Sequence, residues 1–101
     1  MGLDAYLLDY DGAQLQVVGD PKSTLHRALR ESNLADTICL RFIDLFGRTT
    51  FNRAQAAVLA SELASLKTSF PPDAKAHVDR LQHLLDLLER RKGYELQFQG
   101  D

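Results

Sequence analysis

The fold is constrained most by residues 38–55, which read Ile-Cys-Leu-Arg-Phe-Ile-Asp-Leu-Phe-Gly-Arg-Thr-Thr-Phe-Asn-Arg-Ala-Gln. At the start of this stretch, apolar side chains recur at every second position. Because successive side chains of a β-strand point to opposite faces, this period predicts a strand over 38–43. We expect Ile38, Leu40 and Phe42 to face the core and the alternate residues to face outward.

The second half of the stretch predicts a turn, a short strand and the start of a helix. Gly47 turns the chain into a β-prone segment, residues 49–51. Asn52 and Gln55 then have the spacing of a capping box, in which each side chain binds the backbone N–H of the other residue. A helix is therefore expected to follow and to end where two consecutive prolines interrupt the pattern.

The N-terminal segment predicts a β-hairpin with Asp11 and Gly12 at its tip. Asp-Gly is a strong hairpin signal because both residues of the tight turn adopt positive φ. A two-residue loop would pair Leu8 with Leu15 and would place a mainly apolar set of side chains on one face. That set comprises Tyr6, Leu8, Tyr10, Ala13, Leu15 and Val17. The other face is mostly polar, so the pattern predicts a half-buried antiparallel hairpin.

Three further elements complete the predicted order. Asp20 as N-cap and Pro21 as first helical residue predict a short helix that ends near residues 31–33. Leucines at three- and four-residue steps predict a long amphipathic helix over 72–92, and residues 94–99 alternate as a strand. The order β-β-α-β-β-α-α-β predicts a two-layer α+β fold. Its sheet would have about five mainly antiparallel strands, with helices on one face.

The composition excludes several classes of protein. The chain has 101 residues, which suits a single domain over residues 1–101, and its hydrophobic content of 45% is that of a globular protein. A net charge of −2 and a pI of about 5.9 argue against nucleic-acid binding. No signal peptide or membrane-spanning run is visible. A single cysteine, Cys39, excludes an internal disulfide, so we expect a cytoplasmic protein.

The titratable residues form no recognisable catalytic or metal-binding motif. His77 and His83 are six residues apart, whereas two metal ligands on one helix face need a spacing of three or four. We therefore expect both of them, and His26, to lie on helix surfaces. No catalytic residue, cofactor or metal is predicted.

Charged side chains gather in the hairpin and around the turn at Gly47. The candidate partner-binding residues are Arg41, Asp44, Arg48, Arg53, Asp9 and Asp11. One interpretation gives them structural duties, such as a turn hydrogen bond for Asp44. The other makes them a recognition surface, because loops on a rigid sheet often carry binding and arginine is enriched at interface hot spots. The sequence leaves both interpretations open.

Four motifs carry a resemblance: Met-Gly-Leu-Asp at 1–4, Cys-Leu-Arg-Phe-Ile-Asp at 39–44, Phe-Asn-Arg-Ala-Gln at 51–55 and Phe-Gln-Gly-Asp at 98–101. Over nearly its whole length the chain resembles a set of small uncharacterised bacterial α+β proteins. That likeness implies no catalytic residues. Small acidic cytoplasmic proteins of this build are also similar in type to immunity proteins that neutralise bacterial toxins, which implies a protein partner such as a cognate toxin.

Three hypotheses about function follow. The first is a non-enzymatic protein that binds a protein partner, most of all an immunity-type protein that neutralises a toxin by direct binding. The second is a small enzyme or small-ligand-binding module with a site near Cys39, Arg41 and Asp44. The third is a homodimeric structural protein, joined through an outer sheet face that Leu7 and Val18 help to make apolar. None of them involves nucleic acid or a membrane.

Overall fold

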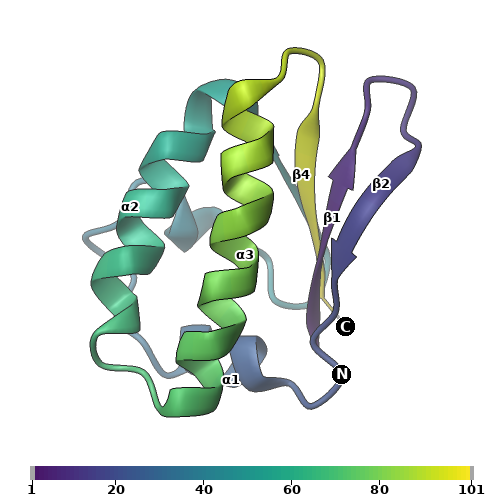
Figure 1. The fold of residues 1–101 in the computed structure, drawn as a ribbon. Coiled ribbons are helices and arrows are strands. Elements are labelled where there is room, and N and C mark those ends of the chain that lie inside the picture. The colour runs from purple at the N-terminus through teal and green to yellow at the C-terminus, as the bar shows by residue number, and fades with distance from the viewer. Residues whose placement is uncertain (1, 101) are drawn as a thin grey trace.

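The computed structural model describes residues 2–100, so Met1 and Asp101, at the ends of the terminal motifs, lie outside the described residues. Helices cover one face of an antiparallel sheet (Figure 1), so the predicted α+β class is confirmed. The main elements are β1 (Leu3–Leu8), β2 (Gln14–Val18), α1 (Thr24–Arg30), β3 (Arg48–Asn52), α2 (Ala56–Lys67), α3 (Pro72–Arg90) and β4 (Glu95–Gly100). Two 3₁₀ turns, Leu40–Phe42 and Arg53–Gln55, precede β3 and α2.

The sheet has the strand order β2-β1-β4-β3, and every neighbouring pair is antiparallel. β1 and β4 are the two central strands. Because their side chains alternate between the faces, Leu3 and Leu7 of β1 and Leu96 and Phe98 of β4 all point toward the helices, where they are buried. The predicted C-terminal strand and its alternation are confirmed.

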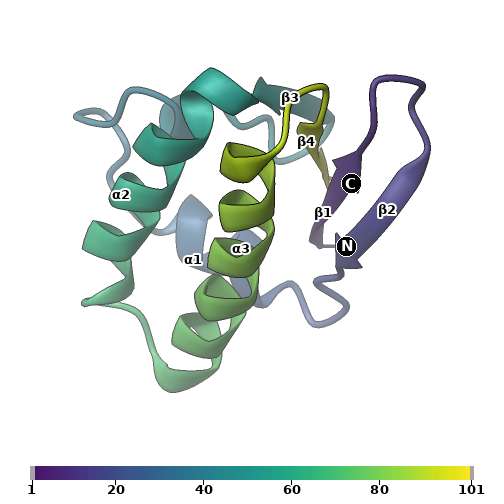
Figure 2. The same ribbon diagram turned by 45° about the horizontal axis from the view of Figure 1, so that its top comes forward.

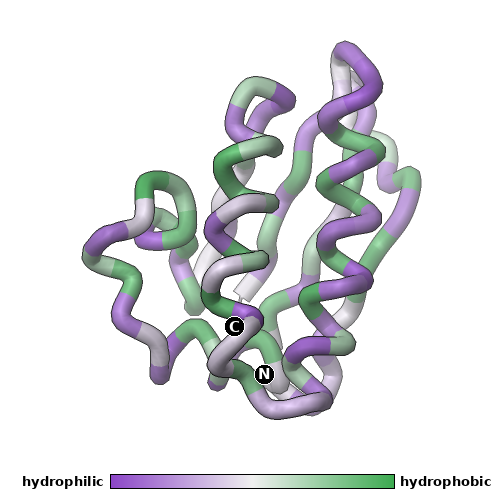
Figure 3. The backbone as a smooth tube through the Cα atoms, turned by 60° about the vertical axis from the view of Figure 1, so that its left-hand side comes forward, coloured by the Kyte–Doolittle hydropathy of each residue, from purple (hydrophilic) through white to green (hydrophobic). Residues whose placement is uncertain are grey.

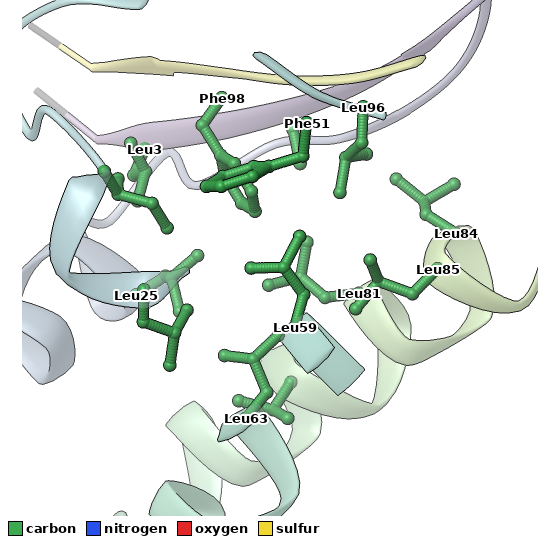
Figure 4. Close-up of a cluster of buried hydrophobic side chains, with 14 of the residues drawn as sticks. Leu3, Leu25, Phe51, Leu59, Leu63, Leu81, Leu84, Leu85, Leu96 and Phe98 are labelled. Carbon is green, nitrogen blue, oxygen red and sulfur yellow. The ribbon is translucent and has the colours of Figure 1, made fainter. Parts of the chain in front are cut away.

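The two layers meet in one leucine-rich core. Figure 4 shows Leu59 of α2 and Leu81 of α3 pointing toward the sheet, where Phe51 and Phe98 lie. The rings of Phe51 and Phe98 pack edge to face, with their centroids 6.0 Å apart. Burying one such side chain contributes about 1.5–3 kcal/mol, so the contact between the layers supplies much of the stability of the fold.

The helix boundaries follow local signals. The capping box of Asn52 and Gln55 is present, although its first turn is 3₁₀ and α2 starts at Ala56. Pro72 opens α3, as its fixed φ and missing N–H allow. The stripe of leucines that predicted α3 is the side that it buries.

The predicted strand over 38–43 is wrong. Leu40–Phe42 is a 3₁₀ turn, so the sheet has four strands instead of about five. Leu40 is fully buried as expected, but Ile38 and Phe42 are 66% and 63% exposed. The physical reason is that a carboxylate of α2 binds the backbone N–H groups that a neighbouring strand would otherwise bind.

The hairpin forms with a different register and a longer turn. Tyr6 pairs with Val17, but an irregularity between Leu7 and Leu8 places Leu8 opposite Gln14, where Leu15 was expected. One extra residue on β2 therefore makes a β-bulge near the tip. The bulge arises because the connection is longer than the two residues that Asp-Gly predicted.

The face of the hairpin that is buried is also the opposite one. Leu7, expected outside, is 2% exposed, whereas Leu15 and Val17 are 43% and 56% exposed. Cys39, also expected on the outer face, is buried in the core. The reason is that β1 lies beneath the helices, while β2 stands at the edge of the sheet beside α3 and is largely exposed (Figure 2). The outer sheet face through which the homodimer hypothesis joins two copies therefore carries different side chains from those that the sequence predicted.

Asp20 joins β1 to α1. Its buried carboxylate accepts hydrogen bonds from the backbone N–H groups of Leu3 at 3.0 Å, Leu25 at 3.1 Å and His26 at 3.0 Å. The helix begins at Thr24, three residues later than predicted. Asp20 nevertheless binds the free N–H groups of the first helical turn, as a capping residue does.

Candidate functional site

The segment that leads into β3, residues 38–48, exposes several large apolar side chains, and we name it the apolar loop. Ile38, Phe42 and Phe46 are 66%, 63% and 65% exposed. Figure 3 shows this part of the chain at the margin of the molecule, with hydrophobic stretches along it. Apolar side chains that gather on one exposed segment are more informative than the same side chains scattered singly.

Glu62 of α2 holds the first half of the apolar loop. Its carboxylate accepts hydrogen bonds from the backbone N–H groups of Ile38, Cys39 at 3.0 Å and Leu40 at 3.1 Å. A hydrogen bond to a charged acceptor contributes roughly 1.5–3 kcal/mol. With the side chain of Leu40 buried below, these bonds fix the backbone from which Ile38 and Phe42 project.

Asp44 holds the second half of the apolar loop. Its Oδ1 accepts the N–H of Phe46 at 2.9 Å, and its own N–H donates to Thr49 Oγ1 at 2.8 Å. A Cβ atom added to Gly47 would lie 2.5 Å from Asp44 Oδ2, so a side chain at this position would displace the Asp44 carboxylate. Asp44 therefore has a structural duty in the turn, as one of the two interpretations expected.

Positive charge borders the exposed apolar side chains. The guanidinium carbon of Arg41 lies 4.9 Å from the centre of the Phe42 ring, in a cation–π contact. Arg48 is exposed at the start of β3. On the inner side, Phe46 meets the ring of buried His26 edge-on, with centroids 5.5 Å apart. The loop thus offers aliphatic and aromatic surface flanked by two arginines.

The six predicted partner-binding residues lie in two groups at opposite ends of the sheet. Arg48 pairs with Gln99 near the end of β4, and Arg41 and Asp44 precede it in the apolar loop. Asp9 and Arg53 directly follow Leu8 and Asn52, the partners of Glu95 at the start of β4, and Asp11 lies in the same hairpin turn as Asp9. The length of β3 separates the two groups, which is roughly 15 Å at about 3.3 Å per strand residue. Arg48 and Arg53 are close in the sequence but far apart in space, because an extended strand lies between them.

Arg53 and Asp9 have structural partners of their own. The Nε of Arg53 donates to the carbonyl oxygen of Glu89 at 2.8 Å, near the C-terminus of α3, where carbonyl groups are free and positive charge is favourable. Asp9 Oδ1 accepts the N–H groups of Asp11 and Ala13, both at 2.9 Å, and so shapes the hairpin turn. A partner-binding role for this end of the molecule stays a prediction.

The second hypothesis placed a small-molecule site near Cys39, Arg41 and Asp44. Cys39 is 4% exposed, whereas the other two residues are exposed. Burial, with the negative charge of Glu62 nearby, raises the pKa of the Cys39 thiol above its ordinary value. Reactive cysteines are accessible and have a lowered pKa, so the environment of Cys39 is that of a structural thiol. The enzyme hypothesis stays a prediction.

The sequence missed a cluster of buried polar side chains. His26 and His77 are each 2% exposed, so their expected place on helix surfaces is wrong. His77 Nδ1 lies 3.9 Å from Asp20 Oδ1 and 3.3 Å from a guanidinium nitrogen of Arg80. Burial lowers the pKa of His77, although the charge on Asp20 opposes this. His77 stands four residues before Leu81 on the apolar stripe of α3, which is the signal that could have revealed its burial.

Residues 2–100 contain no group of three or more His, Cys, Asp and Glu side chains that could hold a metal ion. None of the described helices combines the length and the apolar character that crossing a membrane would require. No protein-family model, curated protein or solved structure matches the chain.

Proposed function

We propose that the protein is a non-enzymatic binding protein whose apolar loop docks on a partner protein. The observation that carries this proposal is the combination of exposure and rigidity in one segment. Ile38, Phe42 and Phe46 present large apolar surfaces to solvent, while Glu62 and Asp44 fix the backbone beneath them. A preordered loop loses little conformational entropy on binding, so more of its contact free energy becomes affinity.

The chemistry of the loop specifies the surface that it would recognise. Aromatic and arginine side chains are enriched at the centres of protein interfaces and among their hot spots. Phe42 would enter an apolar pocket of the partner, and Arg41 and Arg48 would meet carboxylates at the rim of that pocket. The partner class that we propose is a bacterial toxin neutralised by direct contact, which agrees with the resemblance in type to immunity proteins.

Photo-crosslinking in the native cell tests whether this loop meets a protein. A photoreactive amino acid replaces Phe42 in one variant and Arg90, an exposed residue at the end of α3, in the control. We expect a discrete crosslinked protein with the probe at position 42 and none with the probe at position 90. Equal crosslinking at both positions, or none at either, would contradict the proposal.

Affinity for the crosslinked protein then tests the energetics. The double variant Ile38→Ser with Phe42→Ser removes exposed side chains, so its stability should change by less than about 0.5 kcal/mol per site. Its affinity should fall by about 2 kcal/mol or more, roughly 30-fold in Kd. Tyr10→Ser, which truncates an apolar side chain that is 81% exposed at the hairpin tip, should leave the affinity unchanged. A double variant that binds as tightly as the wild type refutes the role of the loop.

Growth of cells that express the partner separates toxin neutralisation from binding of any other kind. The wild-type protein should restore growth when it is co-expressed, and the Ile38→Ser, Phe42→Ser variant should fail to do so. If the partner does not slow growth on its own, the partner is not a toxin, and the proposal that the protein binds a partner is unaffected.

A further inference from the structure

The strand β2 leaves one edge of the sheet open. It pairs with β1 on one side, and nothing in the described part of the chain pairs with its other side (Figures 1 and 2). An open edge presents backbone N–H and C=O groups that another strand can bind. Proteins often protect such edges with charges or proline, but β2 reads Gln-Leu-Gln-Val-Val and contains neither. Its bulge lies near the hairpin tip, so Gln16–Val18 stays regular.

A groove follows the same part of β2. It lies between β2 and α3, has a volume of about 410 Å³, and is lined by Gln16, Val18, Asp79, Arg80, His83 and Leu84. Val18 and the buried Leu84 supply an apolar floor. The wall on α3 is polar. Asp79 pairs with Lys67 of α2, which leaves the exposed Arg80 as the strongest charge that the groove offers to a ligand.

We propose that this edge and groove bind an extended peptide as a fifth strand of the sheet. The backbone of the peptide would pair with Gln16–Val18. Because strand side chains alternate, every second side chain would reach below the flank of α3 into the groove. An apolar side chain would cover Val18 and Leu84, and a neighbouring carboxylate on the same face would meet Arg80.

The exposed guanidinium of Arg80 favours an acidic peptide over a second copy of this chain. A second copy pairing through its own β2 would bring Gln14–Val18, which carries no charged side chain. Arg80 would then gain no carboxylate. Arg80 does contact His77, but a guanidinium has five N–H donors and keeps several free for a ligand. This site lies at the opposite edge of the sheet from the apolar loop, so it is independent of the function proposed above.

The test is a titration of the isotope-labelled protein with the peptide acetyl-Thr-Leu-Thr-Glu-Thr-amide, followed by backbone amide NMR shifts. Its Leu and Glu side chains share one face when it is extended. We expect shift changes confined to Gln16–Val18 and residues 79–84. The same peptide with N-methylated backbone nitrogens, which cannot donate to β2, should not bind.

A double-mutant cycle isolates the contact with Arg80. Arg80→Gln should weaken binding about tenfold, and so should replacing the Glu of the peptide by Gln. The two changes together should weaken it no further than either alone. Arg90→Gln, an exposed arginine on the same helix outside the groove, is the matched control and should have no effect.

Several outcomes would overturn the proposal. These are the absence of shift changes at millimolar peptide, changes outside the two segments, equal binding of the N-methylated peptide, or additive losses in the cycle. Shifts in Gln16–Val18 that depend on protein concentration without peptide would assign the edge to a second copy instead.

Discussion

Replacing Asp20 by asparagine tests whether one buried carboxylate joins β1 to α1. Asp20 is 1% exposed and accepts three backbone N–H groups, from Leu3, Leu25 and His26. Asparagine has nearly the same shape but a single acceptor oxygen, so Asp20→Asn changes the hydrogen bonding with little change in packing. Its effect on stability therefore measures these bonds.

The magnitude follows from counting the bonds. The N–H groups of Leu3 and His26 both bind Oδ2 of Asp20. If the amide oxygen of the asparagine takes the place of Oδ2, these two bonds remain, and the NH₂ group of the asparagine faces the N–H of Leu25. One buried donor left without an acceptor costs about 1–3 kcal/mol. Changing two charged acceptors into neutral ones costs roughly another 0.5–1 kcal/mol each. We expect a total loss of about 3 kcal/mol, a large part of the ~5–15 kcal/mol that a domain of this size has.

Urea unfolding followed by circular dichroism measures this loss. The midpoint should fall while the m-value stays constant, and the melting temperature should drop by roughly 15 °C. Asp11→Asn, at the exposed hairpin tip, is the matched control and should change stability by less than about 0.5 kcal/mol. A loss for Asp20→Asn below about 1 kcal/mol, or one equal to the control, would refute the idea that this carboxylate joins the two elements.

Two further predictions concern pH and close packing. Burial lowers the pKa of His77 in the folded state below its ordinary value of about 6.5, so the unfolded chain binds more protons near this pH. The contribution of His77 to stability is therefore fully present above pH 6.5 and is lost as the pH falls below it. In urea unfolding at several pH values, His77→Gln should remove up to about 1.4 kcal/mol of this dependence per pH unit, and curves parallel to the wild type would contradict the assignment. A Cβ added to Gly100 would lie 2.0 Å from the carbonyl oxygen of Leu45, so Gly100→Ala should lower stability by about 1–3 kcal/mol in urea unfolding. Gly19→Ala, whose nearest contact is 3.8 Å, is its control, and equal losses for the two variants would refute the clash.

The parts of the fold that the sequence predicts correctly depend on signals that lie close together in the chain. The capping box joins Asn52 to Gln55, three residues apart. The leucine stripe of α3 and the alternation of β4 are periodic within one element. Each signal and its physical cause fall inside a single helix or strand, so no knowledge of the rest of the molecule is needed.

The hairpin shows what such signals leave undecided. Both faces of β1 carry apolar side chains, so its own sequence does not say which face is buried. That choice depends on β4, which pairs with β1 some ninety residues along the chain and places Leu7 opposite Leu96 on the face below the helices. The polar character of Gln14 and Gln16 in β2 pointed to the wrong face because β2 forms the edge of the sheet, where residues 14–17 are exposed on both faces.

The alternating pattern of residues 38–43 predicted a strand that does not form, and the interaction that prevents the strand also explains the candidate site. A strand there would have buried Ile38 and Phe42 together with Leu40. Glu62, more than twenty residues away, binds the N–H groups that a neighbouring strand would bind, and the resulting 3₁₀ turn keeps only Leu40 in the core. The residue that overrides the strand pattern is thus the one that leaves Ile38 and Phe42 in solvent on a fixed backbone. A glutamate in the middle of a helix carries no sequence signal for that role. The exposure of Ile38 and Phe42 could therefore not be read from the chain alone, whereas the neighbouring Arg41 and Arg48 were candidates from the sequence.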